Sequence, residues 1–161
     1  MPLYFAYGSN MAVSTMARRC PRSRALSLAR LARHSLCVTR EGWLTATRDP
    51  NGDVWGVLWD LALSDVGELD RYEGVAAGLY SKSSQLVISP GGPKRALVYF
   101  GANAGPGVPR EEYFRDVLSA ARAWRLPERC LASLESMLLN AKSGRGSAAS
   151  KRGSRIVRPP G

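Results

Sequence analysis

The stretch Tyr4-Phe5-Ala6-Tyr7-Gly8-Ser9-Asn10, near the start of the chain, decides how the rest is interpreted. Apolar and aromatic residues run almost without interruption over residues 2–7, which predicts a mostly buried β-strand. Gly8-Ser9-Asn10 then makes a turn, and Asn10 is a suitable N-cap for a helix over residues 11–20. Because successive backbone N–H groups at such a turn can hold an anion, this segment is the first candidate for a functional site.

A second stretch, Leu69-Asp70-Arg71-Tyr72-Glu73-Gly74-Val75, supplies one carboxylate in a position suited to proton transfer. Ser64 is a suitable N-cap for a short helix over residues 65–72, and Gly74 is typical of a helix end. Glu73 then lies among apolar neighbours, a setting that raises the pKa of a carboxyl group towards neutrality. The alternative for Glu73 is an ordinary solvent-exposed glutamate at the end of a helix.

The middle of the chain has the pattern of β-hairpins. Asp49-Pro50-Asn51-Gly52-Asp53 is a strong turn signal, so the strand-like segments 25–40 and 54–61 are expected to pair across it. A second hairpin is expected over residues 79–100, with its turn at Ser89-Pro90-Gly91-Gly92-Pro93.

Two helices are expected after a loop of glycine and proline over residues 101–109. In each of them apolar residues recur at helical spacing, and the second begins at Pro127. The residues expected to face inward are Tyr113, Val117, Ala120, Ala121 and Trp124, followed by Leu131, Leu134 and Leu138. Hairpins with helices set apart from them indicate the α+β class with a mostly antiparallel sheet.

Length and hydropathy indicate a single globular domain. A chain of 161 residues can bury a core without the help of disulfides or a metal. No run of about 18 apolar residues occurs, so we expect no membrane partner. The first residues lack the charged segment of a signal peptide, and Cys20, Cys37 and Cys130 include no Cys-x-x-Cys pair. We therefore expect a cytoplasmic protein with no metal site.

The net charge of +10 suggests nucleic acid at first sight, but its distribution weakens that interpretation. Residues 142–161 contain six basic and no acidic side chains, whereas the other 141 residues contain 17 basic and 13 acidic ones. We therefore expect residues 142–161 to be a basic, disordered tail after a folded domain over residues 1–141. The alternative is a weak electrostatic arm for RNA or an anionic surface.

Four motifs together resemble the γ-glutamylcyclotransferase family of AIG2-like proteins. Along the chain they are Tyr4 to Met11, Val54-Trp55-Gly56-Val57-Leu58-Trp59, Leu69 to Val75, and Gly78-Leu79-Tyr80. Any one of them is weak evidence, but four in the family's order are specific. With the helical pair of residues 109–139, the similarity covers roughly residues 2–139.

The resemblance implies a small mixed, mostly antiparallel β-barrel with flanking helices. It also implies a cofactor-free enzyme, an acyltransferase or lyase, that converts the γ-glutamyl amide of an amino acid or amine into 5-oxoproline and free amine. The family's catalytic glutamate matches Glu73, its γ-glutamyl-holding loop matches Tyr7-Gly8-Ser9-Asn10, and a substrate-contacting tyrosine matches Tyr80. The alternatives are an ordinary turn capped by Asn10 for the loop and a core aromatic for Tyr80.

These residue types suit the reaction because the substrate brings its own nucleophile. The α-amino group of a γ-glutamyl amide can fold back onto the γ-carbonyl and close a five-membered ring. The protein then has to hold the folded conformer, move one proton and stabilise negative charge. A single carboxylate can act first as base and then as acid, and assistance of this kind contributes about 10²–10⁴-fold.

Two segments depart from the family pattern. Residues 40–48, which contain Glu41-Gly42-Trp43, are shorter and less glycine-rich, and this affects the pocket for the leaving amine. The segment after Asn140 matches no part of the family pattern.

Two other functions stay open, namely removal of a γ-glutamyl protecting group in a biosynthetic pathway and a non-catalytic binding module with the same fold. A Ser-His-acid triad is not expected, because His34 is the only histidine and lies in a strand-like stretch.

Overall fold

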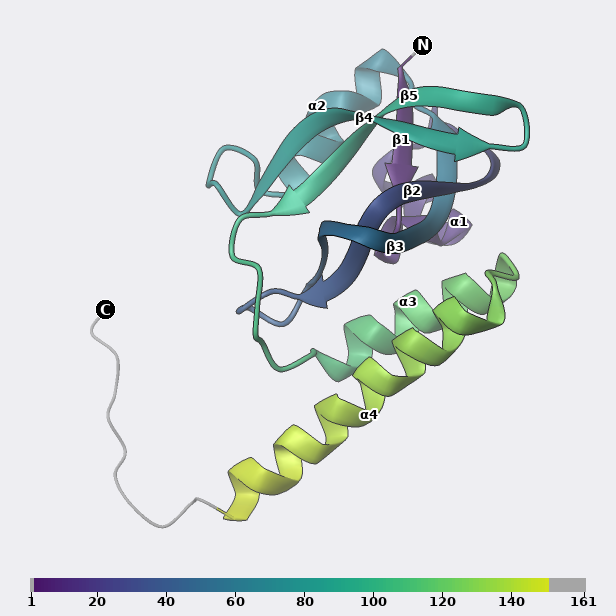
Figure 1. The fold of residues 1–161 in the computed structure, drawn as a ribbon. Helices are drawn as coiled ribbons and strands as arrows, with labels where there is room; N and C mark the ends of the chain where they lie inside the picture. The colour runs from purple at the N-terminus through teal and green to yellow at the C-terminus, as the bar shows by residue number, and fades with distance from the viewer. Residues whose placement is uncertain (1, 151–161) are drawn as a thin grey trace.

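The computed structural model describes residues 2–150, with side chains up to Ser143, and within them five strands close into a barrel (Figure 1). The spatial order is β1–β3–β2–β4–β5, in which β1 and β5 are parallel and the other neighbours antiparallel. The expected small mixed, mostly antiparallel barrel is confirmed. The strands are β1 (Leu3–Ala6), β2 (Arg24–Val38), β3 (Leu44–Asp60), β4 (Tyr80–Ser89) and β5 (Gly92–Gly101).

Helices flank this barrel. They are the 3-10 helix η1 (Ser9–Met11) and the α-helices α1 (Val13–Arg19), α2 (Leu63–Tyr72), α3 (Glu111–Ala123) and α4 (Glu128–Ser150). In Figure 1, α3 and α4 lie side by side below the barrel, and α3 also contacts η1. Phe114 and Val117 of α3 are fully buried in the same core as Phe5 of β1. This shared core holds α3 against the turn that follows β1.

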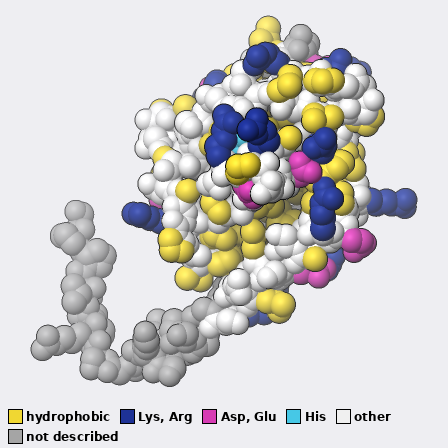
Figure 2. All heavy atoms as spheres, viewed as in Figure 1, with side chains coloured by type: hydrophobic (Ala, Val, Ile, Leu, Met, Phe, Trp, Pro, Cys, Tyr) yellow, Lys and Arg dark blue, Asp and Glu magenta, His cyan; other side chains and the backbone are white. Residues whose placement is uncertain are grey.

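The surface is mixed in charge. On the face seen in Figure 2, Lys and Arg side chains form separate groups with acidic and hydrophobic side chains between them. None of the described helices combines the length and apolar character needed to cross a membrane. The expectation about nucleic acid stays a prediction.

The turn between β2 and β3 lies elsewhere than the sequence predicts. The chain reverses at residues 39–43, where the Thr39 N–H donates to the Trp43 carbonyl at 2.7 Å. β3 then continues from Leu44 through residues 49–53, so the expected hairpin turn at 49–53 is wrong.

Residues 49–53 form a bulge within β3 instead of a hairpin turn. The pairs on either side of the bulge are His34 with Arg48 and Ala32 with Asp53. Residues 49–52 therefore lie opposite Arg33 alone, which adopts a left-handed φ of 62°. The Asp49 carboxylate accepts the Asn51 N–H at 3.1 Å, so the turn chemistry is present, but within a long strand.

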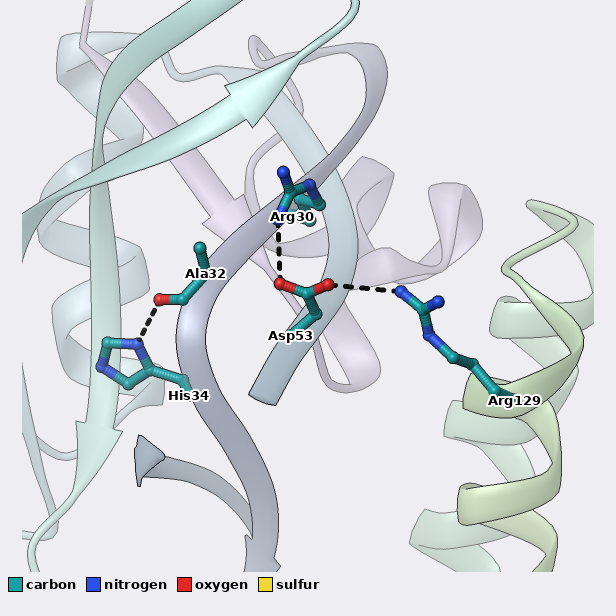
Figure 3. Close-up of polar contacts among 5 residues, drawn as sticks. All are labelled: Arg30, Ala32, His34, Asp53 and Arg129. Atoms are coloured by element: carbon teal, nitrogen blue, oxygen red, sulfur yellow. Dashed lines mark hydrogen bonds and ion pairs between the residues drawn. The ribbon is translucent and has the colours of Figure 1, made fainter. Parts of the chain in front are cut away.

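Asp53, beside this bulge, connects the barrel to the helical pair (Figure 3). Its carboxylate accepts from Arg30 of β2 at 2.9 Å and from Arg129 of α4 at 3.3 Å.

His34 is buried and donates through Nδ1 to the Ala32 carbonyl at 3.0 Å. These contacts give His34 a structural role at the bulge.

The two predicted N-caps are also wrong. α1 follows Ala12 and α2 follows Ala62, and neither start has a side-chain cap. The side chain of Asn10 is used elsewhere, in contacts described below. Before α2, the Ala62 N–H donates to the hydroxyl of Ser23, the residue that precedes β2, at 3.1 Å, and Ser64 makes no cap.

The second helix of the pair is longer than expected. α4 continues to Ser150 and so includes residues 142–150 of the expected tail. Residues 151–161 lie outside the described residues. The division of the chain at residue 141 stays a prediction.

Asp65 fixes the start of α2 against the barrel. It is 4% exposed, and its carboxylate accepts the Arg22 N–H at 3.0 Å and the Ser23 hydroxyl at 2.8 Å. Ser23 in turn accepts from the Ala62 N–H. The Asp65 carboxylate therefore holds together the chain that leads into β2 and the start of α2.

Replacing Asp65 by Ala should therefore destabilise the fold by about 1–3 kcal/mol, because buried donors lose their acceptor. Urea unfolding measures the change in the free energy of unfolding. Asp116→Ala, which alters an exposed carboxylate on α3, is the matched control and should change little. Equal effects of the two substitutions would contradict a role for Asp65 as an anchor.

Candidate active site

A cavity of about 230 Å³ opens at the end of the barrel where β1 and β5 finish and β3 and β4 begin. Its lining brings together all six residues singled out from the sequence, although they come from separate parts of the chain. They are Tyr7, Gly8, Ser9, Asn10, Glu73 and Tyr80. The lining is otherwise mostly aromatic, with Tyr4, Phe5, Trp43, Tyr72, Tyr99 and Tyr113.

Glu73 is one of two carboxylates that line this cavity. It directly follows α2, and its N–H donates to the Leu69 carbonyl at 2.9 Å. Burial raises the pKa of Glu73 to about 7, with Arg19 acting in the opposite direction. A carboxyl group with this pKa can both accept and donate a proton near neutral pH.

Asn10 connects Glu73 to the rest of the site. It is 3% exposed, and its side-chain amide donates to Glu73 Oε1 at 3.3 Å and to the Tyr4 hydroxyl at 3.0 Å. Its side-chain oxygen accepts from Arg19 at 2.5 Å. These three partners explain why Asn10 does not cap the following helix.

Arg19 contacts the site, although the sequence analysis did not single it out. Its guanidinium donates to Asn10 and, at 3.2 Å, to the Ser9 hydroxyl. Its guanidinium carbon also lies 3.3 Å from the centre of the Tyr72 ring. Asn10 lies in η1, before α1 begins, so no helical spacing connects it with Arg19, and nothing in the sequence places Tyr72 nearby.

The tyrosine hydroxyls of the cavity are bound to the protein itself. Tyr7 donates to the Tyr99 carbonyl at 2.5 Å, and Tyr80 donates to the Leu44 carbonyl at 2.7 Å. Tyr99 donates to Asp70 at 2.5 Å. Burial raises the pKa of all three phenols, so they stay protonated and keep these contacts.

The turn at Gly8 is packed closely against α3. A Cβ at this position would lie 2.8 Å from the Tyr113 hydroxyl oxygen. The N–H groups of Ser9 and Asn10 open η1, and neither has a backbone acceptor in the described part of the chain. Since both residues line the cavity, the start of η1 offers free donors to an anion.

The lining also includes Glu41, Trp43 and Tyr113, which were not among the site residues predicted from the sequence. The rings of Trp43 and Tyr113 meet edge to face at 5.0 Å between centroids. Within residues 2–143, no three His, Cys, Asp or Glu side chains form a group that could hold a metal ion.

The sequence of this chain is similar to a family model and to several named proteins. A model of the AIG2-like family matches residues 53–134. A human protein named gamma-glutamylcyclotransferase is 29% identical over 136 residues, which are 78% of this chain and 72% of the human one. A bovine protein of the same name is 38% identical over 88 residues, only 48% of this chain and 47% of the bovine one.

Solved structures agree with this likeness. One named gamma-glutamyl cyclotransferase has a TM-score of 0.77 at 27% identity, covering 83% of this chain and 86% of the other. A human protein described as uncharacterized has a TM-score of 0.76 at 28% identity, covering 83% and 85%.

The raised pKa of Glu73 predicts a pH-dependent stability. Between its ordinary value of 4.5 and about 7, the unfolded chain ionises Glu73 while the folded protein keeps the proton. The folded state therefore loses stability as pH rises through this window. Glu73→Gln does not titrate, so its free energy of unfolding, compared with that of the parent, should gain about 3 kcal/mol between about pH 4 and about pH 8.

Urea unfolding of both proteins at the two pH values measures this difference. Glu68→Gln, at an exposed position of the same helix, should show no such growth. A difference that stays constant with pH would contradict the raised pKa.

Proposed function

Because this chain belongs to the AIG2-like family, we propose that it is a γ-glutamylcyclotransferase, which converts a γ-glutamyl amide into 5-oxoproline and a free amine. Proteins of this name from human and cattle are among its relatives. The observation that carries the proposal is Glu73, a carboxylate with a near-neutral pKa in an aromatic cavity beside free backbone donors.

The reaction is an intramolecular aminolysis. The α-nitrogen of the glutamyl group forms a bond to its own γ-carbon, and the bond between that carbon and the leaving nitrogen breaks. The proton lost by the attacking nitrogen moves to the leaving nitrogen, so no water and no external nucleophile enter. The protein has to hold the curled conformer. This proximity effect can lower the activation free energy by about 7 kcal/mol when the reacting groups are well oriented.

Glu73 carries the proton between the two nitrogens. Its pKa of about 7 is close to the operating pH, so the ionised form can accept the proton and the neutral form can return it. The Asn10 amide, 3.3 Å from Glu73 Oε1, orients the carboxylate. Arg19 orients Asn10 and limits the rise in the pKa of Glu73.

The turn at Gly8, Ser9 and Asn10 holds the anionic part of the substrate. In our proposal the N–H groups that open η1 bind either the α-carboxylate or the oxyanion that develops at the γ-carbon. Tyr7 and Tyr80 line the same cavity and shape the space in which the glutamyl chain folds. Their hydroxyls are held by backbone carbonyls, so the walls are fixed before the substrate arrives.

We also propose that the protein acts in the cytoplasm. Cys20, Cys37 and Cys130 are all free thiols, which suits a reducing compartment.

The decisive substitution is Glu73→Gln, which keeps the shape of the side chain but removes proton exchange. We expect the release of 5-oxoproline from γ-glutamyl dipeptides to fall by at least about 10²-fold. In the parent, kcat/KM should rise with pH up to about 7, because only the ionised carboxylate can act as base. Chromatographic measurement of 5-oxoproline tests both statements.

Glu68→Gln on α2 is the control and should keep the parent's activity and pH profile. Undiminished turnover by folded Glu73→Gln would remove Glu73 from the mechanism. The absence of 5-oxoproline with every γ-glutamyl amide would refute the proposed reaction.

The close packing at Gly8 gives a second test. A methyl group there would press on the Tyr113 hydroxyl, 2.8 Å away, and shift the turn that holds the substrate. We expect Gly8→Ala to lower kcat/KM by about tenfold, since small displacements at a positioning loop are costly. Adding Tyr113→Phe removes the opposing oxygen and should restore part of the loss. A double variant no better than Gly8→Ala would show that the contact with Tyr113 is not the cause.

A further inference from the structure

The hydroxyl groups of Ser9 and Tyr72 meet at the cavity. Both residues line it, and the two oxygens lie 3.3 Å apart in a hydrogen bond that is exposed to solvent. They come from separate elements, because Ser9 is the first residue of η1 and Tyr72 is the last residue of α2. The steps of the proposed reaction make no use of either hydroxyl.

A count of hydrogen atoms shows that this Ser9–Tyr72 pair has one left over. Arg19 donates to the Ser9 hydroxyl oxygen at 3.2 Å, and a guanidinium has no acceptor to offer in return. The bond between Ser9 and Tyr72 uses one of the two hydroxyl hydrogens, whichever group donates. Within the described residues, neither hydroxyl donates to any further protein atom. One hydrogen of the pair is therefore free to bind a ligand.

The free hydrogen is best placed on Tyr72. When Arg19 donates to Ser9 and Ser9 donates to Tyr72, each bond polarises the next and the chain gains from cooperativity. A phenolic O–H is also a better donor than an aliphatic one, because the ring withdraws charge from the oxygen. The chain of hydrogen bonds therefore begins at the guanidinium and ends in a free O–H on Tyr72.

The phenol of Tyr72 lies among the tyrosines of the cavity. Burial raises the pKa of Tyr80 and of Tyr113, and the nearby Tyr72 phenol adds to both rises. Both of these residues line the cavity. One face of the Tyr72 ring is covered by Arg19, whose guanidinium carbon is 3.3 Å from the ring centre. The ring is therefore held in place while its hydroxyl stays at the cavity.

The charge beside this hydroxyl is positive. Arg19 contacts Tyr72 through the ring and Ser9 through a hydrogen bond. Burial raises the pKa of Glu73 and the charge of Arg19 opposes that rise, so the guanidinium acts on the same part of the cavity. A hydrogen bond to an ionised acceptor is roughly twice as strong as one to a neutral acceptor. The free O–H of Tyr72 is therefore suited to an anion.

The chemistry of the substrate identifies this anion. A γ-glutamyl group has one permanent negative charge, its α-carboxylate, and the carbon that carries it also carries the attacking α-nitrogen. That nitrogen has to reach Glu73, so the α-carboxylate has to bind close by. Tyr72 directly precedes Glu73, and Ser9 directly precedes Asn10, whose side chain binds Glu73. The Ser9–Tyr72 pair therefore lies in the region that the α-carboxylate has to occupy.

We propose that Tyr72 binds the substrate, by donating the free hydroxyl hydrogen of the Ser9–Tyr72 pair to the α-carboxylate of the γ-glutamyl group. The inference rests on the proposed cyclotransferase activity and adds a substrate contact to its site. The end of α2 then has two roles, because Tyr72 holds the substrate while Glu73, the next residue, moves its proton. The α-carboxylate keeps its charge throughout ring closure, so this contact stabilises the bound substrate and the transition state alike.

Tyr72→Phe tests the contact, because it removes the hydroxyl and keeps the ring on Arg19. At a residue that is 44% exposed, this change should leave the fold intact. With the γ-glutamyl dipeptide that the parent converts fastest, we expect KM to rise about fivefold and kcat to stay within about twofold, as for any loss of uniform binding. Release of 5-oxoproline, measured by chromatography, gives both constants.

A competitor without the charge is the matched control. It is the same dipeptide with the α-carboxylate of its glutamyl residue replaced by a carboxamide. Its Ki against the unmodified dipeptide is defined whether or not it is converted. We expect Tyr72→Phe to change this Ki by less than about twofold, because a neutral acceptor loses less than an ionised one.

Two serine substitutions test the chain of hydrogen bonds. Ser9→Ala breaks the chain but leaves the Tyr72 hydroxyl, so KM should rise by only about twofold. Combined with Tyr72→Phe, it should add little, and KM should stay within about twofold of that of Tyr72→Phe alone. Ser14→Ala, at an exposed position on α1 outside the lining, should change neither kcat nor KM.

Three kinds of result would overturn the assignment of Tyr72. An unchanged KM, or equal changes for the dipeptide and its carboxamide, would show that Tyr72 does not recognise the carboxylate. A fall in kcat at constant KM would place the hydroxyl at the developing oxyanion. A larger effect of Ser9→Ala than of Tyr72→Phe would place the donor on Ser9. In all three cases the cyclisation stands, whereas a parent that releases no 5-oxoproline refutes the proposed function and this inference with it.

Discussion

The site depends on one buried amide. Asn10 donates to Glu73 and Tyr4 and accepts from Arg19, so it joins the turn after β1 to the end of α2, to β1 and to α1. A buried polar group is costly unless its hydrogen bonds are made, and here each partner comes from a different element. The hydrogen bond from Asn10 also orients the carboxylate, and the charge of Arg19, another partner of Asn10, limits the rise in the pKa of Glu73. In this site, fold stability and proton transfer therefore share a single hydrogen-bond network.

Much of the architecture could be predicted from local pattern. Alternating and continuous apolar runs indicated the strands, helical spacing indicated α3 and α4, and four motifs pointed to a barrel of known type. The barrel was confirmed, and the six predicted site residues line one cavity. The prediction was strongest where the motif and the local chemistry agreed, as at Glu73, which has apolar neighbours and follows directly after a helix.

The rest depended on partners distant in sequence. The turn residues 49–53 have the chemistry of a hairpin end, yet pairing with β2 continues on both sides of them, and only a bulge remains. Asn10 has the chemistry of a helix cap, but Glu73, Tyr4 and Arg19 compete for its side chain. Local propensity does not include such competition. Glu41 likewise acquires its setting from Asn103, across a long separation in the chain.

The way the barrel closes has a consequence for how the protein is made. β1 is the first strand of the chain, but it lies between β3 and β5, and its parallel contact with β5 joins Tyr4 to Leu97. The Tyr7–Tyr99 hydrogen bond spans 92 positions. During synthesis, β1 can pair with β3, but its other edge has no partner until β5 has emerged, and the turn that follows β1 has to wait for α3 as well. The cavity is thus among the last features to be assembled, and a nascent chain interrupted before β5 would display an apolar first strand open to chaperones or to aggregation.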